Sequence, residues 1–278
     1  MHRIAGLLLM TGILLSACQG MGVTPVVDEA PVTPSPTPLF AADQVTITLV
    51  YDNTTDNPDL MVEWGFAAVV NVDGRSLLFD TGLDGPSLMN NLAVLGIDPH
   101  SIEMVVISHE HADHTGGLQA FLEANPDVEI YVPMSNAILA AAEEAQINVI
   151  ALADPIELLP GVYTTGTLDG GIPEQGLVIS TEEGSVVITG CAHPGIVNIV
   201  QRAVEVLPVE PALVLGGFHL GGYSSSTVRT IIEEFRNLGV QRVSPTHCTG
   251  EEAIAAFAEA YGDDYLQGGA GVVYTFGQ

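Results

Sequence analysis

The sequence of 278 residues contains no lysine, and its six basic residues, all arginines, stand against 34 acidic ones. The formal net charge at pH 7 is therefore −28. Such an acidic surface repels phosphate backbones and anionic headgroups, so we expect no nucleic-acid partner. The same charge suits an exported protein that must stay soluble. It does not describe an active site, where bound metal ions can dominate the local field.

Cysteine is also scarce, with only Cys18, Cys191 and Cys248 in the chain. Cys191 and Cys248 each lie close to a histidine in the second half of the sequence. A disulfide between them is possible in an oxidising compartment, provided that their Cα atoms come within bonding range. We favour two unpaired cysteines that line or border a site.

The one hydrophobic run of the sequence that resembles a signal segment lies at the N-terminus. Arg3 precedes the apolar residues 4–15, a run too short to span a bilayer comfortably. Residues 15–18 read Leu-Ser-Ala-Cys, as in a bacterial lipobox. We therefore predict a lipoprotein signal peptide at 1–17 and a lipidated Cys18 that anchors an exported protein to the cell envelope. An ordinary cleavable signal or a short N-terminal anchor is the alternative.

Residues 18–44 are predicted to form a tether. Five prolines between residues 25 and 38 favour an extended, semi-rigid chain, and few large apolar side chains are present to drive collapse. The folded domain is expected at 45–278, a length that fits one domain.

The most informative segment is residues 108–114, which read Ser-His-Glu-His-Ala-Asp-His. It follows the apolar run 104–107, which predicts a buried strand, and it precedes Thr-Gly-Gly at 115–117, which is expected to open a helix. Imidazoles and carboxylates are the ligands that zinc, iron and manganese take from proteins. A metal-binding turn is therefore favoured over a solvated turn with three accidental histidines.

Strands and helices alternate along the rest of the chain. Strands are predicted at 46–51, 67–71, 76–79, 129–132, 161–164, 177–180, 185–189, 212–215, 242–243 and 272–276. Helices are predicted at 86–96, 116–124, 135–145, 196–206, 226–238 and 251–260. This order predicts an α/β fold, an αββα sandwich of two packed sheets with helices on the outer faces. Turns at the C-terminal ends of the strands would then converge along one edge of the sandwich.

Three further segments accompany the histidine-rich turn. Residues 77–82 end in Asp-Thr-Gly, and residues 187–195 and 244–250 each place a histidine after an apolar strand. Together with 108–114 they resemble the metallo-β-lactamase superfamily. The wording Gly-Cys-Ala-His-Pro-Gly is most similar to the branch named after the archaeal dihydropterin-methyl-ribofuranosylaminobenzene-phosphate synthase. The resemblance covers almost all of the predicted domain and implies the metallo-β-lactamase fold.

The resemblance also implies a set of metal ligands, which are His109, His111, Asp113, His114, His193 and His247. His109 and His111 would bind a first ion, with His193 as the candidate that closes this site. Asp113, His114 and His247 would bind a second ion. Asp80 would orient the ligands rather than bind metal, since a carboxylate behind an imidazole fixes its tautomer.

Two positions depart from the family pattern. Cys191 stands where common binuclear members carry a bridging aspartate, and its thiolate would favour zinc over magnesium or manganese. Glu174 and Gln175 stand where those members have a further histidine. We expect two zinc ions, with iron or manganese as other possible metals. A bridge made only of hydroxide, or a weak or empty second site, stays open.

Other side chains fall outside the set of ligands that the resemblance implies. His219 follows an apolar strand, and it could bind metal, contact substrate as an acid or donor, or simply be hydrogen-bonded in a loop. Trp64, the only tryptophan, could cap a pocket or pack as an ordinary aromatic residue. His100 belongs to a predicted surface turn and receives no role.

These observations predict an exported, membrane-tethered hydrolase of small molecules. A metal-activated water would attack an ester, phosphoester, lactone or amide bond, with Asp113 and His219 as catalytic residues. The alternatives are a pterin-related transferase like the namesake of the branch, an iron-dependent redox enzyme, and a binding lipoprotein without catalysis.

Overall fold

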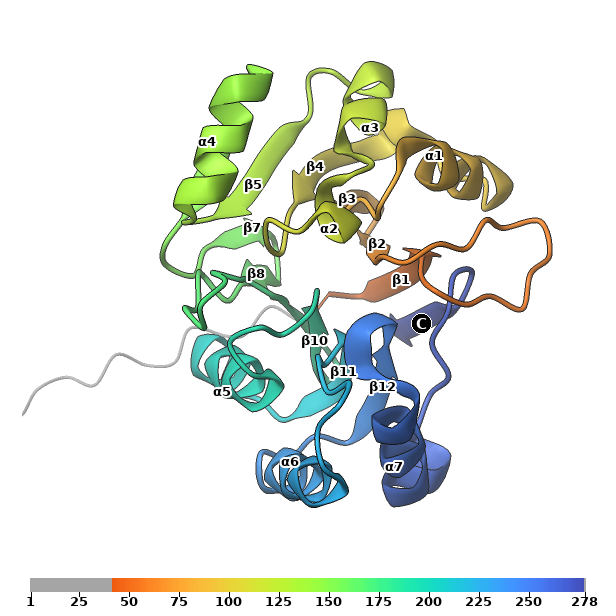
Figure 1. The fold of residues 1–278 in the computed structure, drawn as a ribbon, viewed down its shortest axis with the longest axis vertical. Coiled ribbons are helices and arrows are strands. Elements are labelled where there is room, and N and C mark those ends of the chain that lie inside the picture. Colours follow the sequence, from red (N-terminus) through yellow and green to blue (C-terminus); the bar gives the residue numbers. More distant parts are fainter. Residues whose placement is uncertain (1–41, 278) are drawn as a thin grey trace, which may run out of the picture. The chain divides into compact units, whose positions relative to one another are not determined.

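Two mixed β-sheets face each other in the computed structural model, which describes residues 42–277 (Figure 1). The first sheet has the order β13-β1-β2-β3-β4-β5-β6. Its strands are β1 (Gln44–Tyr51), β2 (Ala67–Val72), β3 (Arg75–Phe79), β4 (Ile102–Val106), β5 (Glu129–Pro133), β6 (Ile150–Leu152) and β13 (Val273–Gly277). The second sheet has the order β12-β11-β10-β9-β8-β7. Its strands are β7 (Glu157–Leu159), β8 (Val162–Thr164), β9 (Leu177–Thr181), β10 (Gly184–Thr189), β11 (Pro211–Gly217) and β12 (Arg242–Thr246).

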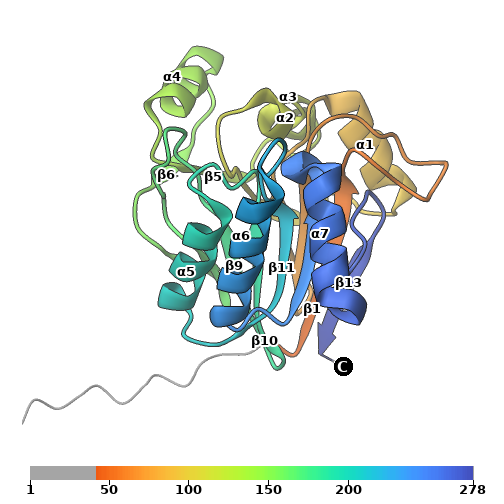
Figure 2. The same ribbon diagram turned by 60° about the horizontal axis from the view of Figure 1, so that its bottom comes forward.

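Helices cover the outer face of each sheet, as Figures 1 and 2 show. They are α1 (Gly85–Val94), α2 (Ala112–Thr115), α3 (Leu118–Ala124), α4 (Asn136–Ala145), α5 (Ile196–Val206), α6 (Ser225–Asn237) and α7 (Glu251–Tyr261). Short 3₁₀ turns lie at η1 (Pro99–Ser101), η2 (His247–Thr249) and η3 (Gly262–Asp264). The first four helices lie on the side of the first sheet, and α5, α6 and α7 cover the second. The predicted αββα sandwich is confirmed.

Alternating side chains of the strands explain this layering. In β4, Met104 and Val106 point into the core between the sheets, whereas Val105 packs into the core under α1 and α3. In β10, Ile188 joins the core between the sheets and Val187 packs against α5. Both faces of these strands are buried, so they read as continuous apolar runs rather than as alternating ones.

The helix predicted at 116–124 is α3, which begins two residues later than predicted. A short helix that was not predicted, α2, precedes it within the histidine-rich segment. A Cβ atom on Gly116 would lie 1.9 Å from the Leu83 carbonyl oxygen, and one on Gly117 would lie 2.2 Å from that of Thr81. The two glycines therefore allow the chain to pass closely over the turn after β3, and Gly117 is also the N-cap residue of α3.

The other predicted elements are present, with shifts of a few residues at their ends. The helix predicted at 196–206 is α5. The two short edge strands β6 and β7 were not predicted. Each has only three residues, too few to show a hydrophobic periodicity, and Pro155 lies between them. Among the described residues no helix is both long enough and apolar enough to cross a bilayer. The predicted signal peptide, Cys18 and nearly all of the tether lie outside the described residues.

Candidate metal centre

The predicted ligands come together at one edge of the sandwich, where several strands end. The turn after β4 carries His109 and His111, and α2 carries Asp113 and His114. The remaining ligands follow strands of the second sheet, with His193 after β10 and His247 in η2 directly after β12. Both sheets therefore contribute side chains to the same edge. Asp80, at the end of β3, lies beneath them.

His109, His111 and His193 form the first cluster. The Nε2 atom of His109 lies 3.1 Å from Nδ1 of His111, and Nε2 of His193 lies 3.2 Å from both of these nitrogens. Neutral imidazoles have one donor and one acceptor nitrogen each, so three nitrogens meeting at one point cannot all satisfy one another. A cation at that point would satisfy all three.

The environment keeps two of these imidazoles in the form that binds metal. Burial and the neighbouring His114 and His193 hold the pKa of His109 well below its ordinary value. Burial, and then the charge of His219, lowers the pKa of His193 to about 4. Both rings are therefore neutral at pH 7, as metal coordination requires.

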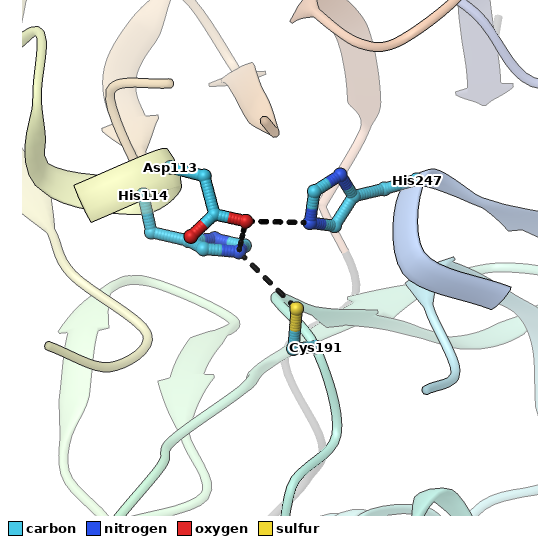
Figure 3. Close-up of side chains that lie close together, drawn as sticks. All are labelled: Asp113, His114, Cys191 and His247. Carbon is cyan, nitrogen blue, oxygen red and sulfur yellow. Dashed lines mark hydrogen bonds and ion pairs between the residues drawn. The ribbon is translucent and has the colours of Figure 1, made fainter. Parts of the chain in front are cut away.

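Asp113, His114, Cys191 and His247 form the second cluster (Figure 3). Oδ2 of Asp113 lies 3.3 Å from Nε2 of His247 and 3.7 Å from Nε2 of His114. Sγ of Cys191 lies 3.3 Å from the same His114 nitrogen. Nε2 of His247 is buried and, although it lies 3.3 Å from the Asp113 carboxylate, it has no hydrogen-bond partner among residues 42–277. An orphaned imidazole nitrogen that faces a carboxylate and a thiol is a fitting position for a cation.

Asp80 is fully buried and holds the ligands from behind. One of its carboxylate oxygens lies 2.7 Å from Nδ1 of His114 and accepts the Ser108 hydroxyl at 2.7 Å, and the other accepts the Ser108 backbone N–H at 2.7 Å. Burial disfavours the charged form of His114, but the charge of Asp80 outweighs it and raises the pKa of this imidazole. Because Asp80 engages Nδ1, the Nε2 atom of His114 is left facing the second cluster.

His247 is oriented by a residue that the sequence did not single out. Nδ1 of His247 lies 3.1 Å from Oδ1 of Asn53, and Nδ2 of Asn53 donates to the His247 carbonyl at 2.9 Å. His247 has a positive φ of 50°. The neighbouring Thr246 hydroxyl donates to buried Asp52 at 2.5 Å. The polar loop after β1 therefore fixes the backbone and the ring of this ligand.

Glu174 does not take the place of a ligand histidine. It is fully buried, and its carboxylate accepts the backbone N–H groups of Cys191, Ala192 and His193 at 2.9, 2.8 and 2.8 Å. Gln175 donates from its side chain to the Ile107 carbonyl at 2.9 Å. The two residues support the turns that carry the ligands, and an acidic residue in an otherwise apolar region was the only sequence signal of this role.

Cys191 and Cys248 carry free thiols, and His219 joins them in a third group. The ligand atoms of the three residues all lie within 4.8 Å of one another. A Cβ atom on Gly217 would lie 2.6 Å from Sγ of Cys248, so this glycine provides the space in which Cys248 lies. The ring of His219 lies 4.5 Å from that of His193, centre to centre, and is largely exposed. His219 therefore borders the first cluster.

Trp64 lies over the second cluster. Its Nε1 donates to Oδ2 of Asp113 at 2.9 Å, and its ring lies 5.0 Å from that of His247, centre to centre. The indole remains 54% exposed. It is thus neither an ordinary core residue nor a distant surface one. His100, in contrast, lies on the surface beside Asp98.

The donor sets fit divalent transition metals. Three imidazoles in the first cluster, and two imidazoles with a carboxylate and a thiol in the second, are typical of zinc or iron sites. Calcium and magnesium favour ligand sets made of oxygen atoms, which neither cluster offers. The described residues can therefore hold up to two ions side by side.

Comparisons with known proteins agree with this geometry. A profile of the metallo-beta-lactamase superfamily matches residues 65–247, which include both clusters. A 7,8-dihydropterin-6-methyl-4-(beta-D-ribofuranosyl)-aminobenzene-5'-phosphate synthase of Methanocaldococcus jannaschii is 28% identical over 280 residues, covering 82% of this chain and 95% of the archaeal protein. The predicted resemblance to that branch is thereby confirmed.

Solved structures share the fold. Tm1679, described as a metal-dependent hydrolase of the beta-lactamase superfamily, is 29% identical and superposes with a TM-score of 0.68, over 83% of this chain and 98% of that one. A diphosphatase of the PhnP family superposes with a TM-score of 0.57 at 16% identity, over 84% of this chain and 97% of that one. At that identity the second likeness concerns the fold alone.

Proposed function

The chain belongs to the metallo-beta-lactamase superfamily, and on that premise we propose that it is a metal-dependent hydrolase of a small molecule. The observation that carries the proposal is the convergence of three imidazole nitrogens within 3.2 Å in the first cluster, beside the unpartnered Nε2 of His247. The similarity to Tm1679 supports the reaction class.

A divalent ion bound at such a site lowers the pKa of a water toward neutral and polarises the bond under attack. This chain's residues would do the rest. Burial raises the pKa of Asp113, but the neighbouring His247 and His114 outweigh it and lower the net value, so the carboxylate is ionised at pH 7. Trp64 fixes that carboxylate with a hydrogen bond. His219, exposed beside His193, is suited to give a proton to the leaving group.

We propose zinc as the metal, with two ions per chain. Sulfur is a soft ligand, and Cys191 therefore favours zinc in the second cluster over manganese or magnesium. Iron remains the second candidate, since imidazole and carboxylate also suit it. Metal analysis of the purified protein distinguishes these possibilities.

The test is hydrolysis by protein that has been stripped of metal and then reloaded with zinc. A panel of an aryl ester, an aryl phosphodiester, a lactone and an aryl amide covers the bond types. We expect turnover of at least one substrate that disappears on stripping, returns with zinc, and is lost in the double variant His109→Ala with His111→Ala. His100→Ala, on the surface, is the matched control. Full activity and full metal content in the double variant would refute the proposal.

The second candidate is a transferase reaction like that of the similar synthase of M. jannaschii, which 28% identity over most of both chains favours. The positions of the five described arginines argue against a phosphate-bearing substrate. Arg75 and Arg242 begin β3 and β12, at the ends opposite the ligands, and Arg202, Arg229 and Arg236 lie on α5 and α6. Formation of a pterin adduct without any hydrolysis would favour this candidate.

We also propose export and lipid anchoring at Cys18, on the sequence evidence of the apolar segment and the Leu-Ser-Ala-Cys motif. The membrane would then be a partner through the lipid alone. Incorporation of labelled palmitate in the native chain and its absence in Cys18→Ser tests this proposal. A Cys191→Ser variant, which keeps the motif, is the control.

A further inference from the structure

We propose that the substrate carries an uncharged aliphatic chain, which lies in a cavity beside the metal centre. The cavity lies between α4 on one side and α2 and α3 on the other, and His111 forms part of its wall. This inference rests on the proposed hydrolase function, and it names the class of substrate: an ester or lactone of an aliphatic acid.

The cavity has a volume of about 590 Å³. Small-molecule sites usually measure about 300–1,000 Å³, so it can take a medium-sized ligand. Its floor is the outer face of the first sheet, with Ile107, Val132 and Val149. Leu118 and Ala112 close the side toward α3 and α2. Most of the lining is therefore aliphatic, and its polar residues are Glu110, His111, Thr115 and Gln119.

The sequence of α4 accounts for the empty space. The residues of this helix that face the cavity are Ala137, Ile138, Ala141, Ala142 and Ala145. Their spacing places them on one face of the helix. Ile138 is the one buried residue that α4 contributes, and the alanines are too short to fill the space above the sheet. In Figures 1 and 2, α4 accordingly stands apart from α2 and α3.

His111 connects the cavity to the first metal cluster. This residue lines the cavity, and its Nδ1 lies 3.2 Å from Nε2 of His193. Its neighbours Glu110 and Ala112 also line the cavity. A chain in the cavity would therefore place its polar end next to the metal ligands. Burial of the chain would hold the reacting bond there.

The lining selects against two other kinds of ligand. The lining residues, all of which the structure describes, include no phenylalanine, tyrosine or tryptophan on which a flat heteroaromatic ring could stack. They also include no arginine to bind a phosphate. The carboxylate of Glu110, which accepts a hydrogen bond from the Ser135 hydroxyl, stands in the wall and repels anions. An uncharged aliphatic chain matches all three features.

The experiment measures kcat/KM of the zinc-loaded full chain on aryl esters of acetic, butyric, octanoic and decanoic acid. Each buried methylene contributes about 0.8 kcal/mol, or about a fourfold gain in kcat/KM for every methylene added. Because the cavity is open to solvent, we expect a smaller total, between about tenfold and a hundredfold, from butyryl to octanoyl. In Ala141→Phe the added ring fills the cavity, and the ratio of octanoyl to butyryl should fall toward one. In Ala140→Phe, on the same helix but outside the lining, the preference should persist.

A second measurement separates this inference from the hydrolase proposal. Saturation-transfer NMR with octanol, which does not depend on turnover, should show binding to metal-free protein and to Ala140→Phe but not to Ala141→Phe. If no ester is hydrolysed but octanol binds in this pattern, the hydrolase proposal fails and the cavity assignment stands. Equal kcat/KM for all chain lengths, or octanol binding that is absent or unchanged in Ala141→Phe, overturns the inference.

Discussion

The carboxylate of Glu174 accepts the backbone N–H of His193 at 2.8 Å, and this bond sets the direction in which the histidine enters the metal centre. The same carboxylate also accepts the N–H groups of Cys191 and Ala192. One buried side chain thus shapes the whole turn that supplies one ligand to each cluster. Burial raises the pKa of the Glu174 carboxyl, and the three backbone hydrogen bonds offset only part of this rise.

Glu174→Gln should weaken both clusters. Glutamine keeps one acceptor oxygen but turns an NH₂ group toward a backbone N–H, so at least one buried donor loses its partner. Hydrogen bonds to charged groups contribute about 1.5–3 kcal/mol, and we expect a loss of about 2 kcal/mol in the free energy of unfolding. Urea unfolding of metal-free protein measures this loss. Glu182→Gln, on the surface, is the control, and equal stability of the two variants would contradict the role of Glu174.

Cys191→Ser should release the second ion and leave the first. The thiol lies 3.3 Å from Nε2 of His114, whereas none of the first cluster's three nitrogens depends on it. Losing a hydrogen-bond partner behind a ligand typically costs about 10–100-fold in metal affinity, and losing the ligand itself should cost more. Competition with a chelator measures the two affinities. Cys248→Ser, outside the second cluster, should retain both ions. Two unchanged affinities in Cys191→Ser would show that sulfur does not bind metal here.

The fluorescence of Trp64 should report on the second site. This residue is the only tryptophan, and it donates a hydrogen bond to Asp113. When zinc draws the Asp113 carboxylate toward itself, the environment of the indole changes. Titration of metal-free protein with zinc should therefore change the emission until the second site is filled. The variant His109→Ala should keep this response and His247→Ala should lose it; the reverse pattern would contradict the assignment of the clusters.

Sequence reasoning predicted the layered fold and the side chains that converge at its edge, because both depend on local sequence patterns. Apolar runs of strand length predict the sheets, and the ligands of α2 and of the preceding turn lie within residues 109–114. It identified Asp80 behind the ligands, but it missed Asn53 and left open whether Trp64 lies at the site. Asn53 and His247 are 194 residues apart in the chain, and Trp64 and Asp113 are 49 apart. Nothing near Asn53 in the sequence indicates such contacts, because only the folded sandwich brings its loop to the ligand edge.

The contribution of Asp52 to the stability of the metal-free protein should fall as the pH rises from about 4 to about 6, whereas the lowered pKa values of His109 and His193 make their contributions rise with pH. Burial raises the pKa of Asp52 from 3.8 to about 6, despite the hydrogen bond from Thr246 and the charge of His247. Between these two pKa values the Asp52 carboxyl of the folded state holds a proton that the unfolded state has released, so the contribution of Asp52 decreases with pH by up to about 3 kcal/mol. Below the lower value both states are protonated and the penalty vanishes.

Asp52→Asn should remove this part of the pH dependence, because the amide stays neutral and still accepts the Thr246 hydroxyl. Urea unfolding at several pH values measures it. Asp56→Asn, exposed on the same loop, is the control. A pH profile identical in the native chain and in Asp52→Asn would mean that Asp52 ionises normally in the folded protein.

The central claim is that the two clusters bind metal, and metal content by inductively coupled plasma mass spectrometry tests it most directly. The sample is protein purified without chelator and without a nickel column. The account predicts about two zinc ions per chain, and about one in the double variant His109→Ala with His111→Ala. Protein that retains no transition metal, and takes up none when zinc is offered, would contradict it and leave a binding protein with this fold.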